Sequence, residues 1–458
     1  MKNVLFSSQL SKLTSDGNKI KKYHDGEGLY FWVFDNGSYS YKRWVFKYTF
    51  NKFSFCSACF ACTFFITVLC SINKIYLEQF NMLITITEPE SFFDCFSSLP
   101  DPRKDINKKH LMIDIIFITV CAVISGVTSW EQIEDFAIDR EEWLRKYISL
   151  PNGIPSHDTI RYLFLFLNEN AFNKAFAEWV KMIKPKLEDM HIAIDGKTNR
   201  RSGNKNKTLK PLHNVTAFAT GMSLALGQVH VDEKSNEITA IPELLDMLEI
   251  KGCFITIDAM GCQKDIAQKI DKDGGTYILA VKGNQKNLHE EISDYFEDAL
   301  ATNFKDINFK RIKTVENDHG RLEDREYYIT SDIEDLFETK KWSGLSTIAM
   351  VVAKRKIDGK TTIEKRFYIS NCKKDNEKIA KYIRGHWGIE NSFHWVLDMD
   401  FNEDQCRKRM KNSAKNIATV RKIALNMLKN EKTYKASIKS KILKAARNTD
   451  YLENVLGI

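Results

Sequence analysis

The ten cysteines of this 458-residue chain lack the spacing of a secreted disulfide framework. Most stand singly in apolar runs, as Cys121 and Cys253 do, which is typical of reduced core cysteines in the cytosol. The Cys-x-x-Cys-x-x-Cys run at 56–62 has a spacing close to that of iron–sulfur proteins, but it lacks a nearby fourth ligand and the usual proline. The cysteines therefore argue against a secreted disulfide scaffold and do not favour a metal cluster.

Acidic residues are nearly absent from residues 407–447, which hold fourteen Lys and Arg against the single acid Glu431. This stretch contributes +13 to a formal net charge of +8, so the rest of the chain is about five charges negative. A concentrated basic face suits a protein that binds a polyanion, because each neutralised phosphate releases a counterion. A solvated lysine-rich helix is the alternative interpretation.

Charged residues are also missing from residues 53–73, an apolar run about the length of a membrane span. It is either a transmembrane helix or a segment that is apolar by accident. The chain has no internal repeat and no long low-complexity tract. Its 43 % apolar and 28 % charged residues are ordinary for a globular protein of two to four domains.

The hydrophobic pattern changes twice along the chain. Residues 12–51 alternate aromatic and polar residues and predict a small β module, with a hairpin turning at Asn36-Gly37. Residues 88–190 are helical in pattern, and Ser129 is the expected N-cap of a helix that begins at Trp130.

From His191 the period shortens to two. Short apolar strands are expected at 191–195, 254–258 and 277–281, with a hairpin over 213–231, helices between them, further β pattern over 308–370 and helices over 376–430. Strands interleaved with helices predict an α/β sheet.

Two of these strands end in an acid, Asp195 and Asp258. Ligands bind outside the carboxyl ends of strands in open α/β sheets, and carboxylates there could converge on hard divalent cations. Glu390 is the candidate third acid. On a helix it falls at i+4 spacing with His386, His394 and Asp398, which predicts one polar stripe; a solvent-facing stripe is the alternative.

Several motifs recur in a family's order: Ile194-Asp195-Gly196-Lys197, Ile257-Asp258-Ala259-Met260-Gly261-Cys262-Gln263-Lys264, Val281-Lys282-Gly283-Asn284-Gln285, His319-Gly320-Arg321, His386-Trp387-Gly388-Ile389-Glu390-Asn391-Ser392-Phe393-His394-Trp395 and Phe401-Asn402-Glu403-Asp404. Together they resemble the ISAs-type, or H-repeat-associated, insertion-sequence transposases. The resemblance covers about residues 82–430, because 99–103 and 153–159 resemble that family's N-terminal associated region.

This resemblance implies an α/β fold with a ribonuclease-H-like catalytic core, a β-rich insertion at about 305–370, and a preceding helical domain. It implies a DDE triad of Asp195, Asp258 and Glu390 that binds two Mg²⁺ ions, for which Mn²⁺ can substitute. Water would cut a phosphodiester and the freed 3′-hydroxyl would attack target DNA, without a covalent enzyme intermediate. Whether Asp398, Asp400, Glu403 or Asp404 assists is left open.

The expected partner is double-stranded DNA, both the terminal repeats of the element and the target. The candidate DNA contacts are Lys197, Arg200, Arg201, Lys205, Lys282, Arg321, Arg384, His386 and His394. Related DDE transposases carry a tyrosine and an arginine before the glutamate and a lysine after it; here Ile383, His386 and Leu397 stand in those places, so Arg384 or His386 would substitute. We expect a homodimer in the synaptic complex, a cytoplasmic, nucleoid-associated location in a bacterium, and no membrane partner.

The N-terminal residues match nothing in that family. Parts of 12–51 resemble the arm-type DNA-binding domain of tyrosine integrases, which suggests that an insertion element landed in an integrase gene. The expected domains are an integrase-like β module (1–51), an apolar read-through linker (52–81), a helical transposase-associated domain (82–190), the catalytic domain (191–430) and a basic helical tail (431–458). An inactive DNA-binding remnant of a fused element and a membrane-anchored protein are the alternative functions.

Overall fold

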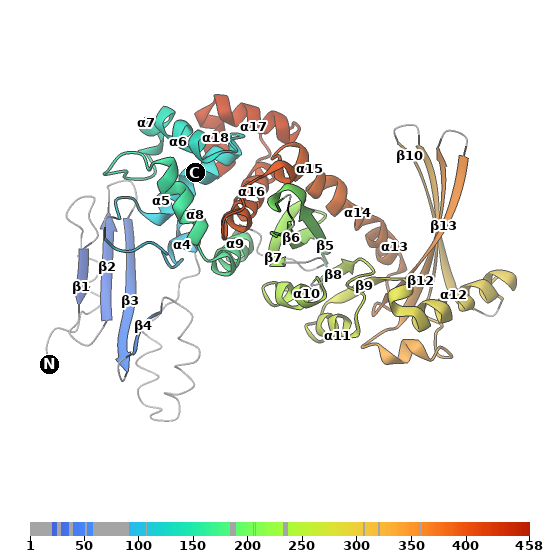
Figure 1. The fold of residues 1–458 in the computed structure, drawn as a ribbon. Helices are drawn as coiled ribbons and strands as arrows, with labels where there is room; N and C mark the ends of the chain where they lie inside the picture. The colour runs from blue at the N-terminus through green and yellow to red at the C-terminus, as the bar shows by residue number, and fades with distance from the viewer. Residues whose placement is uncertain are drawn as a thin grey trace. The chain divides into compact units, whose positions relative to one another are not determined.

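The computed structural model describes residues 91–458 except 107, 184–188, 205, 207, 232–236, 306, 319–320 and 358–359. It also describes the backbone of four strands between residues 21 and 57. The chain forms two compact units: residues 1–122 with 127–163, and residues 123–126 with 164–458. Figure 1 shows the elements of both units.

The first unit contains a four-stranded antiparallel sheet in chain order. Its strands are β1 (Lys21–His24), β2 (Leu29–Asp35), β3 (Ser40–Phe50) and β4 (Phe53–Ser57). β2 and β3 pair as the sequence predicts, although the turn at Asn36-Gly37 lies outside the described residues. The apolar run begins within β4, and its residues 58–73 are not described; in the described chain, no helix is long and apolar enough to cross a membrane.

The helices after this sheet begin where the sequence places polar caps. They are α4 (Phe92–Ser97), α5 (Met112–Ile124), α6 (Trp130–Asp139), α7 (Glu141–Leu144) and α8 (His157–Phe166). Ser129 caps α6 as expected: its side chain accepts from Gln132 N–H, and the Gln132 side chain accepts from the N–H of Ser129 in return. Asp114 lies in the buried helix α5, where burial raises its pKa to about 7.

The second unit is built on a nine-stranded mixed sheet in the order β10-β11-β12-β13-β9-β8-β5-β6-β7. Its strands are β5 (His191–Asn199), β6 (Leu212–Ala219), β7 (Leu224–Val231), β8 (Phe254–Ile257), β9 (Thr276–Val281), β10 (Phe309–Asp318), β11 (Arg321–Thr330), β12 (Thr347–Ile357) and β13 (Lys360–Ser370). β5, β8 and β9 are parallel to one another, and every other pairing is antiparallel. The strands expected at 191–195, 254–258 and 277–281 are the parallel centre of this sheet.

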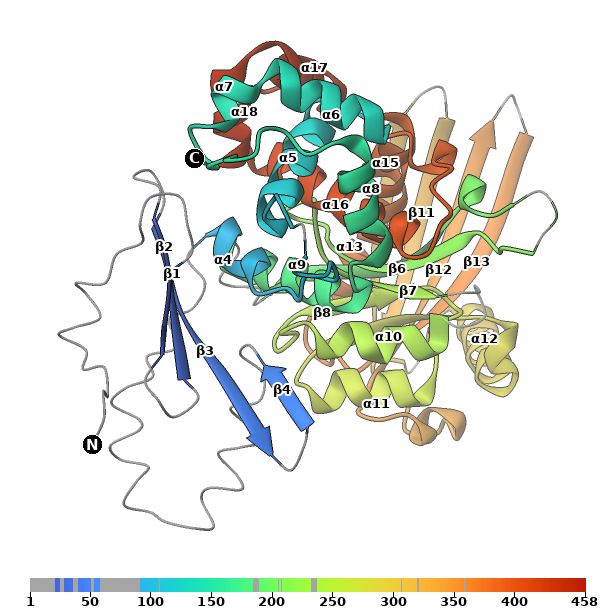
Figure 2. The same cartoon turned by 60° about the vertical axis from the view of Figure 1, so that its left-hand side comes forward.

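Helices cover both faces of the sheet centre (Figure 2). Ile255 of β8 lies near Ile270 of α11 (Lys264–Lys272), around Gly275, and α10 (Glu237–Asp246) packs beside α11. Phe254, the preceding residue on β8, instead packs in an apolar cluster with α13 (Asn376–Gly385). Because neighbouring residues of a strand point to opposite faces, α11 and α13 lie on opposite sides of β8.

The stretch 305–370 extends the same sheet. α12 (Lys286–Ala301) leads into β10, and the four strands β10 to β13 form an antiparallel meander. Only four residue pairs, from Phe367↔Val281 to Ser370↔Ile278, join β13 to β9. The rest of β13 runs past the end of β9, and the long strands stand out from the sheet centre in Figure 1.

The C-terminal helices are α16 (Ser413–Asn430), α17 (Ile438–Arg447) and α18 (Thr449–Leu456). α16 contacts α9 (Glu169–Ile183) and the edge strand β7. The buried amide of Asn426 on α16 bonds both backbone groups of Ala225 on β7: its Nδ2 donates to the carbonyl at 2.8 Å and its Oδ1 accepts from the N–H at 2.9 Å. One side chain thus satisfies both backbone groups of Ala225 on β7, which is an edge strand of the sheet within the described residues.

Asn426→Ala should lower the free energy of unfolding by about 3 kcal/mol, because it leaves a buried N–H and a buried carbonyl of Ala225 without partners. Asn430→Ala, at the partly exposed end of the same helix, should change it by less than about 0.5 kcal/mol. Urea unfolding of both variants measures this. Equal losses in the two would show that the Asn426 bonds have no special role.

Candidate active site

Strand register brings together the first two acids of the site. β5 and β8 pair in parallel up to Ile194↔Ile257. The next residue on each strand is an aspartate, so the backbones of Asp195 and Asp258 lie about one strand spacing, ~4.8 Å, apart. The N–H groups of Met260 and Gly261 donate to Asp258 Oδ1 at 3.0 and 3.3 Å and fix that oxygen.

One detail of the expectation is wrong. β5 does not leave the sheet at Asp195 but continues to Asn199, because the antiparallel partner β6 extends beyond the end of β8. Lys197, two residues after Asp195, is therefore also a residue of β5.

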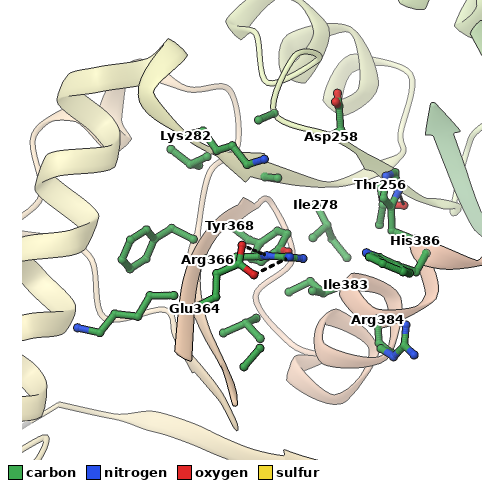
Figure 3. Close-up of a pocket in the computed structure, with 18 of the residues that line it drawn as sticks. Thr256, Asp258, Ile278, Lys282, Glu364, Arg366, Tyr368, Ile383, Arg384 and His386 are labelled. Carbon is green, nitrogen blue, oxygen red and sulfur yellow. Dashed lines mark hydrogen bonds and ion pairs between the residues drawn. The ribbon is translucent and has the colours of Figure 1, made fainter. Parts of the chain in front are cut away.

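Glu390 completes the group from a helical run on the α13 side of the sheet. This run continues through α14 (Trp387–Ile389), a π-helical turn η5 (Glu390–His394) and α15 (Trp395–Met399). Glu390, Asp195 and Asp258 line one cavity of about 360 Å³. Figure 3 shows part of that cavity, with Asp258, His386 and Arg384 on its wall.

The predicted polar stripe contains a π-helical turn. His386 and Glu390 line the cavity, and His394 is buried with its Nδ1 3.7 Å from Asp195 Oδ2. Asp398, the last member, lies 2.6 Å from Lys197 on β5. The four side chains thus face β5 and β8, and the solvent-facing alternative is wrong.

Asp195 carries the electrostatic signature of the site. Burial and the negative charges of Asp258 and Glu390 together raise its pKa to about 7, against one hydrogen bond from the N–H of Gly196 that lowers it. Like charges gathered in a low-dielectric site disfavour ionisation of all of them together. A cation placed among these three carboxylates would remove that penalty.

Lys197 belongs to a buried charge network behind the acids. Its Nζ lies 2.6 Å from Asp398, 3.0 Å from Glu403 and 3.5 Å from Asp404, and its side chain is only 10 % exposed. Burial lowers the pKa of Lys197, but these carboxylates outweigh it and the net pKa is raised. The network joins β5 to the chain segment after Glu390 and leaves Lys197 no open face for a phosphate.

Asp398, Asp400, Glu403 and Asp404 do not line the cavity within the described residues. Glu403 is fully buried; burial raises its pKa, but Lys422, Lys197 and Arg421 lower it to about 2. Three of these four acids are thus counter-ions of Lys197 in this structure.

His386 takes part in a chain of buried hydrogen bonds. Thr256 Oγ1 lies 2.8 Å from His386 Nδ1 and 2.7 Å from His191 Nε2, and His191 Nδ1 lies 2.8 Å from Thr220 Oγ1. Burial lowers the pKa of His386 to about 4, although Asp258 opposes it, and burial lowers that of His191 to about 3. Both rings are neutral at pH 7, so His386 can orient a neighbour by one hydrogen bond but carries no charge toward a phosphate.

The other candidate DNA contacts divide into two groups. Lys282 and Arg384 line the cavity with the three acids, and Arg384 is paired with Glu316 at 2.8 Å. Arg200 and Arg201 are exposed outside the cavity, and Arg200 pairs with Asp404 at 3.3 Å. Lys205 and the side chain of Arg321 lie outside the described residues.

The basic stretch 407–447 is not a uniform open face. Arg421 and Lys422 of α16 are buried, and Lys441 of α17 is buried with its Nζ 3.0 Å from Glu431. For these residues both sequence interpretations, a polyanion-binding face and a solvated helix, are wrong, because α16 packs inside the unit.

Two groups of side chains at the site were not predicted from the sequence. Glu237 and His213 form a buried pair at 2.6 Å behind Gly196, where a side chain would collide with both, and the charge of Glu237 also raises the pKa of Asp195. The arginines at 325, 355 and 366 line the cavity from β11, β12 and β13. Strand alternation would have placed them on one face, but nothing in the sequence shows which strand adjoins β9.

The three acids suit a hard divalent cation in chemistry. They offer carboxylate oxygens and no thiol, and the raised pKa of Asp195 marks negative charge that lacks a counter-ion. No group of three or more His, Cys, Asp or Glu in the described residues is already close enough to hold a metal ion. The carboxylates would therefore have to turn inward to share one.

Two aspartates on neighbouring parallel strands, at the end of their pairing, and a helical glutamate line one cavity of a mixed sheet and define a ribonuclease-H-like DDE core. The description "Transposase DDE domain" fits residues 186–427, and "DDE_Tnp_1-associated" fits residues 93–180. The chain belongs to the H-repeat-associated DDE transposase family.

Curated relatives extend over most of the chain. "Putative transposase YncI" of Escherichia coli O157:H7 is 43 % identical over 372 residues, 80 % of this chain and 95 % of that protein. "H repeat-associated putative transposase YhhI" of Escherichia coli K12 is 41 % identical over 81 % of this chain and 98 % of its own length. A piggyBac transposase synaptic complex with hairpin DNA aligns at a TM-score of 0.37 and 12 % identity, over 78 % of this chain and 75 % of that one, a likeness too low to carry an argument.

Asp195→Asn should stabilise the metal-free protein above pH 7. A folded-state pKa of about 7 against an ordinary 3.8 gives stability that is present below about pH 4 and lost as the pH rises through 7, on the order of 4 kcal/mol. The variant lacks that loss, so its melting temperature should exceed the wild type's at pH 8 and match it more closely at pH 4.

Mg²⁺ supplies the second arm of this experiment. It should raise the melting temperature of the wild type at pH 8 but not that of Asp195→Asn, whereas Asp114→Asn, which removes another buried acid with a pKa near 7, should keep the response to Mg²⁺. An unchanged pH dependence in Asp195→Asn would contradict the electrostatic account of the site.

Proposed function

We propose that this protein cuts DNA at the ends of an insertion element and joins the freed ends to target DNA, using Asp195, Asp258 and Glu390. The observation that carries the proposal is the meeting of these three acids at one cavity, where burial and the charges of the other two raise the pKa of Asp195. The family membership of residues 186–427 supports the same reaction class.

The reaction consists of two phosphoryl transfers in one site. In the first, a water oxygen bonds to the scissile phosphorus, the P–O3′ bond breaks, and the leaving oxygen takes a proton to become a 3′-hydroxyl. In the second, that hydroxyl loses its proton and bonds to a target phosphorus, whose own P–O3′ bond breaks. No protein nucleophile is needed in either step.

Mg²⁺, or Mn²⁺ in its place, would supply Lewis acidity at the phosphate and a lowered pKa for the attacking hydroxyl or water. Asp195, Asp258 and Glu390 are the residues that would hold two such ions. His386, neutral and bonded to Thr256, keeps its ring in a fixed position next to Asp258. Lys282 and Arg384 place positive charge on the cavity wall, where a phosphate backbone would enter.

The reaction determines the partners. Terminal repeats of the element and target DNA are the double-stranded substrates, and cutting two ends together calls for a homodimer in the synaptic complex. We place the protein in the bacterial cytoplasm, associated with the nucleoid, because its substrate is chromosomal DNA.

Asp258→Asn and Glu390→Gln should each lower Mg²⁺-dependent cleavage of a DNA duplex from the border of the element by at least about 100-fold, since loss of even an outer partner of a metal ligand costs 10- to 100-fold. A gel assay of end-labelled duplex measures this. EDTA should abolish cleavage and Mn²⁺ should restore it.

The matched control is Asp265→Asn, an exposed acid at the start of α11 that should cleave like the wild type. If the wild type shows no divalent-ion-dependent cleavage or joining, the protein is an inactive DNA-binding remnant. If the control loses activity equally, the effect is one of general charge rather than of the triad.

We further propose that residues 82–458 are the transposase proper and that residues 1–81 are a fused integrase-like module with a read-through linker. The two family descriptions begin at residue 93 and end at residue 427, inside this range.

A protein of residues 82–458 should therefore melt within a few degrees of the full chain and join DNA at a comparable rate. Calorimetry and the strand-transfer assay test this. Loss of cooperative unfolding or of joining on truncation would rule out the fusion.

A further inference from the structure

A row of alternating arginines and glutamates crosses the extension of the sheet. Starting from the end of α13, consecutive members are linked by ion pairs: Arg384–Glu316 at 2.8 Å, Glu316–Arg325 at 3.0 Å, Arg325–Glu323 at 2.6 Å, Glu323–Arg355 at 2.8 Å, Arg355–Glu364 at 3.8 Å and Glu364–Arg366 at 2.8 Å. We call its four cations, Arg384, Arg325, Arg355 and Arg366, the arginine row.

The pairing of the strands puts these side chains on one face. Glu323 lies opposite Arg355, Arg325 opposite Ala353, and Ala353 opposite Glu364. Residues directly opposite one another across antiparallel strands share a face, and so do residues two apart on one strand. The row therefore runs across β10, β11, β12 and β13 on the face that α13 partly covers.

The arginines and the glutamates differ in what they face. All four arginines line the cavity that holds the three acids, whereas of the three glutamates only Glu364 does. In Figure 3 the Arg366 side chain reaches from β13, bonded to Glu364, toward the side of the cavity that carries His386 and Ile383. Glu316 and Glu323 hold their arginines from outside the cavity lining.

The side chains that line the cavity include more cations than acids. Its cations outnumber its acids six to four; the cations are Lys282, Arg325, Arg355, Lys365, Arg366 and Arg384, and the acids are Asp195, Asp258, Glu364 and Glu390. Divalent ions held by Asp195, Asp258 and Glu390 would increase that excess. Such a wall attracts a polyanion that passes beside the three acids.

Exposure separates the members of the row by role. The side chain of Arg325, in the middle, is 10 % exposed, whereas those of Arg355, Arg366 and Arg384 are 23 %, 31 % and 35 % exposed. Arg325 thus links Glu316 and Glu323 within the row, whereas the other three arginines are exposed enough to contact a ligand. A guanidinium fork grips a phosphate by two parallel hydrogen bonds, and one already ordered by a carboxylate loses little entropy on binding.

We propose that the arginine row is a track for the DNA strand next to the scissile phosphate. Arg366 and Arg355, on β13 and β12, bind successive backbone phosphates, and the strand passes over the free part of β13 that runs beyond β9. This inference rests on the proposed function, because it takes DNA as the ligand. It assigns the β-rich extension the task of aligning the cut strand with Asp195, Asp258 and Glu390.

The opposite face of the same strands offers matched controls. Arg311 and Lys313 on β10 are also paired with acids, Glu326 at 2.9 Å and Asp324 at 2.9 Å, and are 56 % and 51 % exposed. Neither residue lines the cavity. They match the row in charge and ion pairing and differ from it in position.

The test measures binding of a fluorescent DNA duplex from the element border by anisotropy, in EDTA and over a range of salt concentrations. Arg366→Gln and Arg355→Gln should each weaken binding by about three- to tenfold and lower the slope of log Kd against log salt by about 1. Arg311→Gln and Lys313→Gln should leave both quantities unchanged. Arg366→Lys should recover only part of the affinity, because a point charge replaces the fork.

Normal binding and salt slope in both row variants would overturn the inference, as would equal losses in row and control variants.

Arg355→Gln uncovers the buried Glu323, so its melting temperature is measured first. Arg366→Gln, whose partner Glu364 is 47 % exposed, remains informative if Arg355→Gln unfolds. Since EDTA prevents cleavage, the outcome does not depend on catalysis. If the wild type does not cleave DNA but the row variants bind DNA more weakly than it does, only the proposed function is refuted. If the wild type cleaves and the row variants bind DNA with normal affinity, only the track is refuted.

Discussion

The parallel pairing of β5 with β8 is the constraint on which the site depends. It ends at Ile194↔Ile257, and the next residues, both aspartates, have to share one edge of the sheet. Burial of Asp195, together with the charges of Asp258 and Glu390, raises its pKa to about 7 and costs the folded state free energy at neutral pH. The hydrogen bonds between β5 and β8 fix the backbones that carry the two aspartates, so the folded protein keeps this cost. A cation bound among the three acids would lower it.

The cations around β5 fall into two groups. Lys197 is ion-paired with Asp398, Glu403 and Asp404 behind the three acids, and this closed network ties the strand to the chain beyond Glu390. Other cations, among them Lys282 and Arg384, line the cavity with the three acids. Lys197, the lysine nearest to Asp195 in the sequence, is already ion-paired with other carboxylates and does not neutralise the three acids.

The sequence predicts the site's acids better than their surroundings. Asp195 and Asp258 each end a short apolar run, and an apolar run followed by an acid is a local pattern that chain periodicity can detect. The π-helical turn at Glu390–His394 cannot be detected in that way, because helical periodicity assumes a constant turn. The partners of Lys197 are about 200 residues away in the sequence, so an apparently free basic residue turns out to be buried.

The same physical limit applies to the arginines of the extension. Residues 308–370 alternate charges of both signs, which is typical of a solvated β meander, and on sequence alone no face of it is special. The pairing of β13 with β9 distinguishes one face, because its four residue pairs join the meander to β9, the strand next to β8. Once the extension and the catalytic strands are one sheet, the distance from Arg366 to Asp258 is set by backbone hydrogen bonds rather than by a flexible linker. A charged surface held at fixed range from three acids can position a phosphate chain, which a surface on a separate, mobile domain could not do without additional contacts.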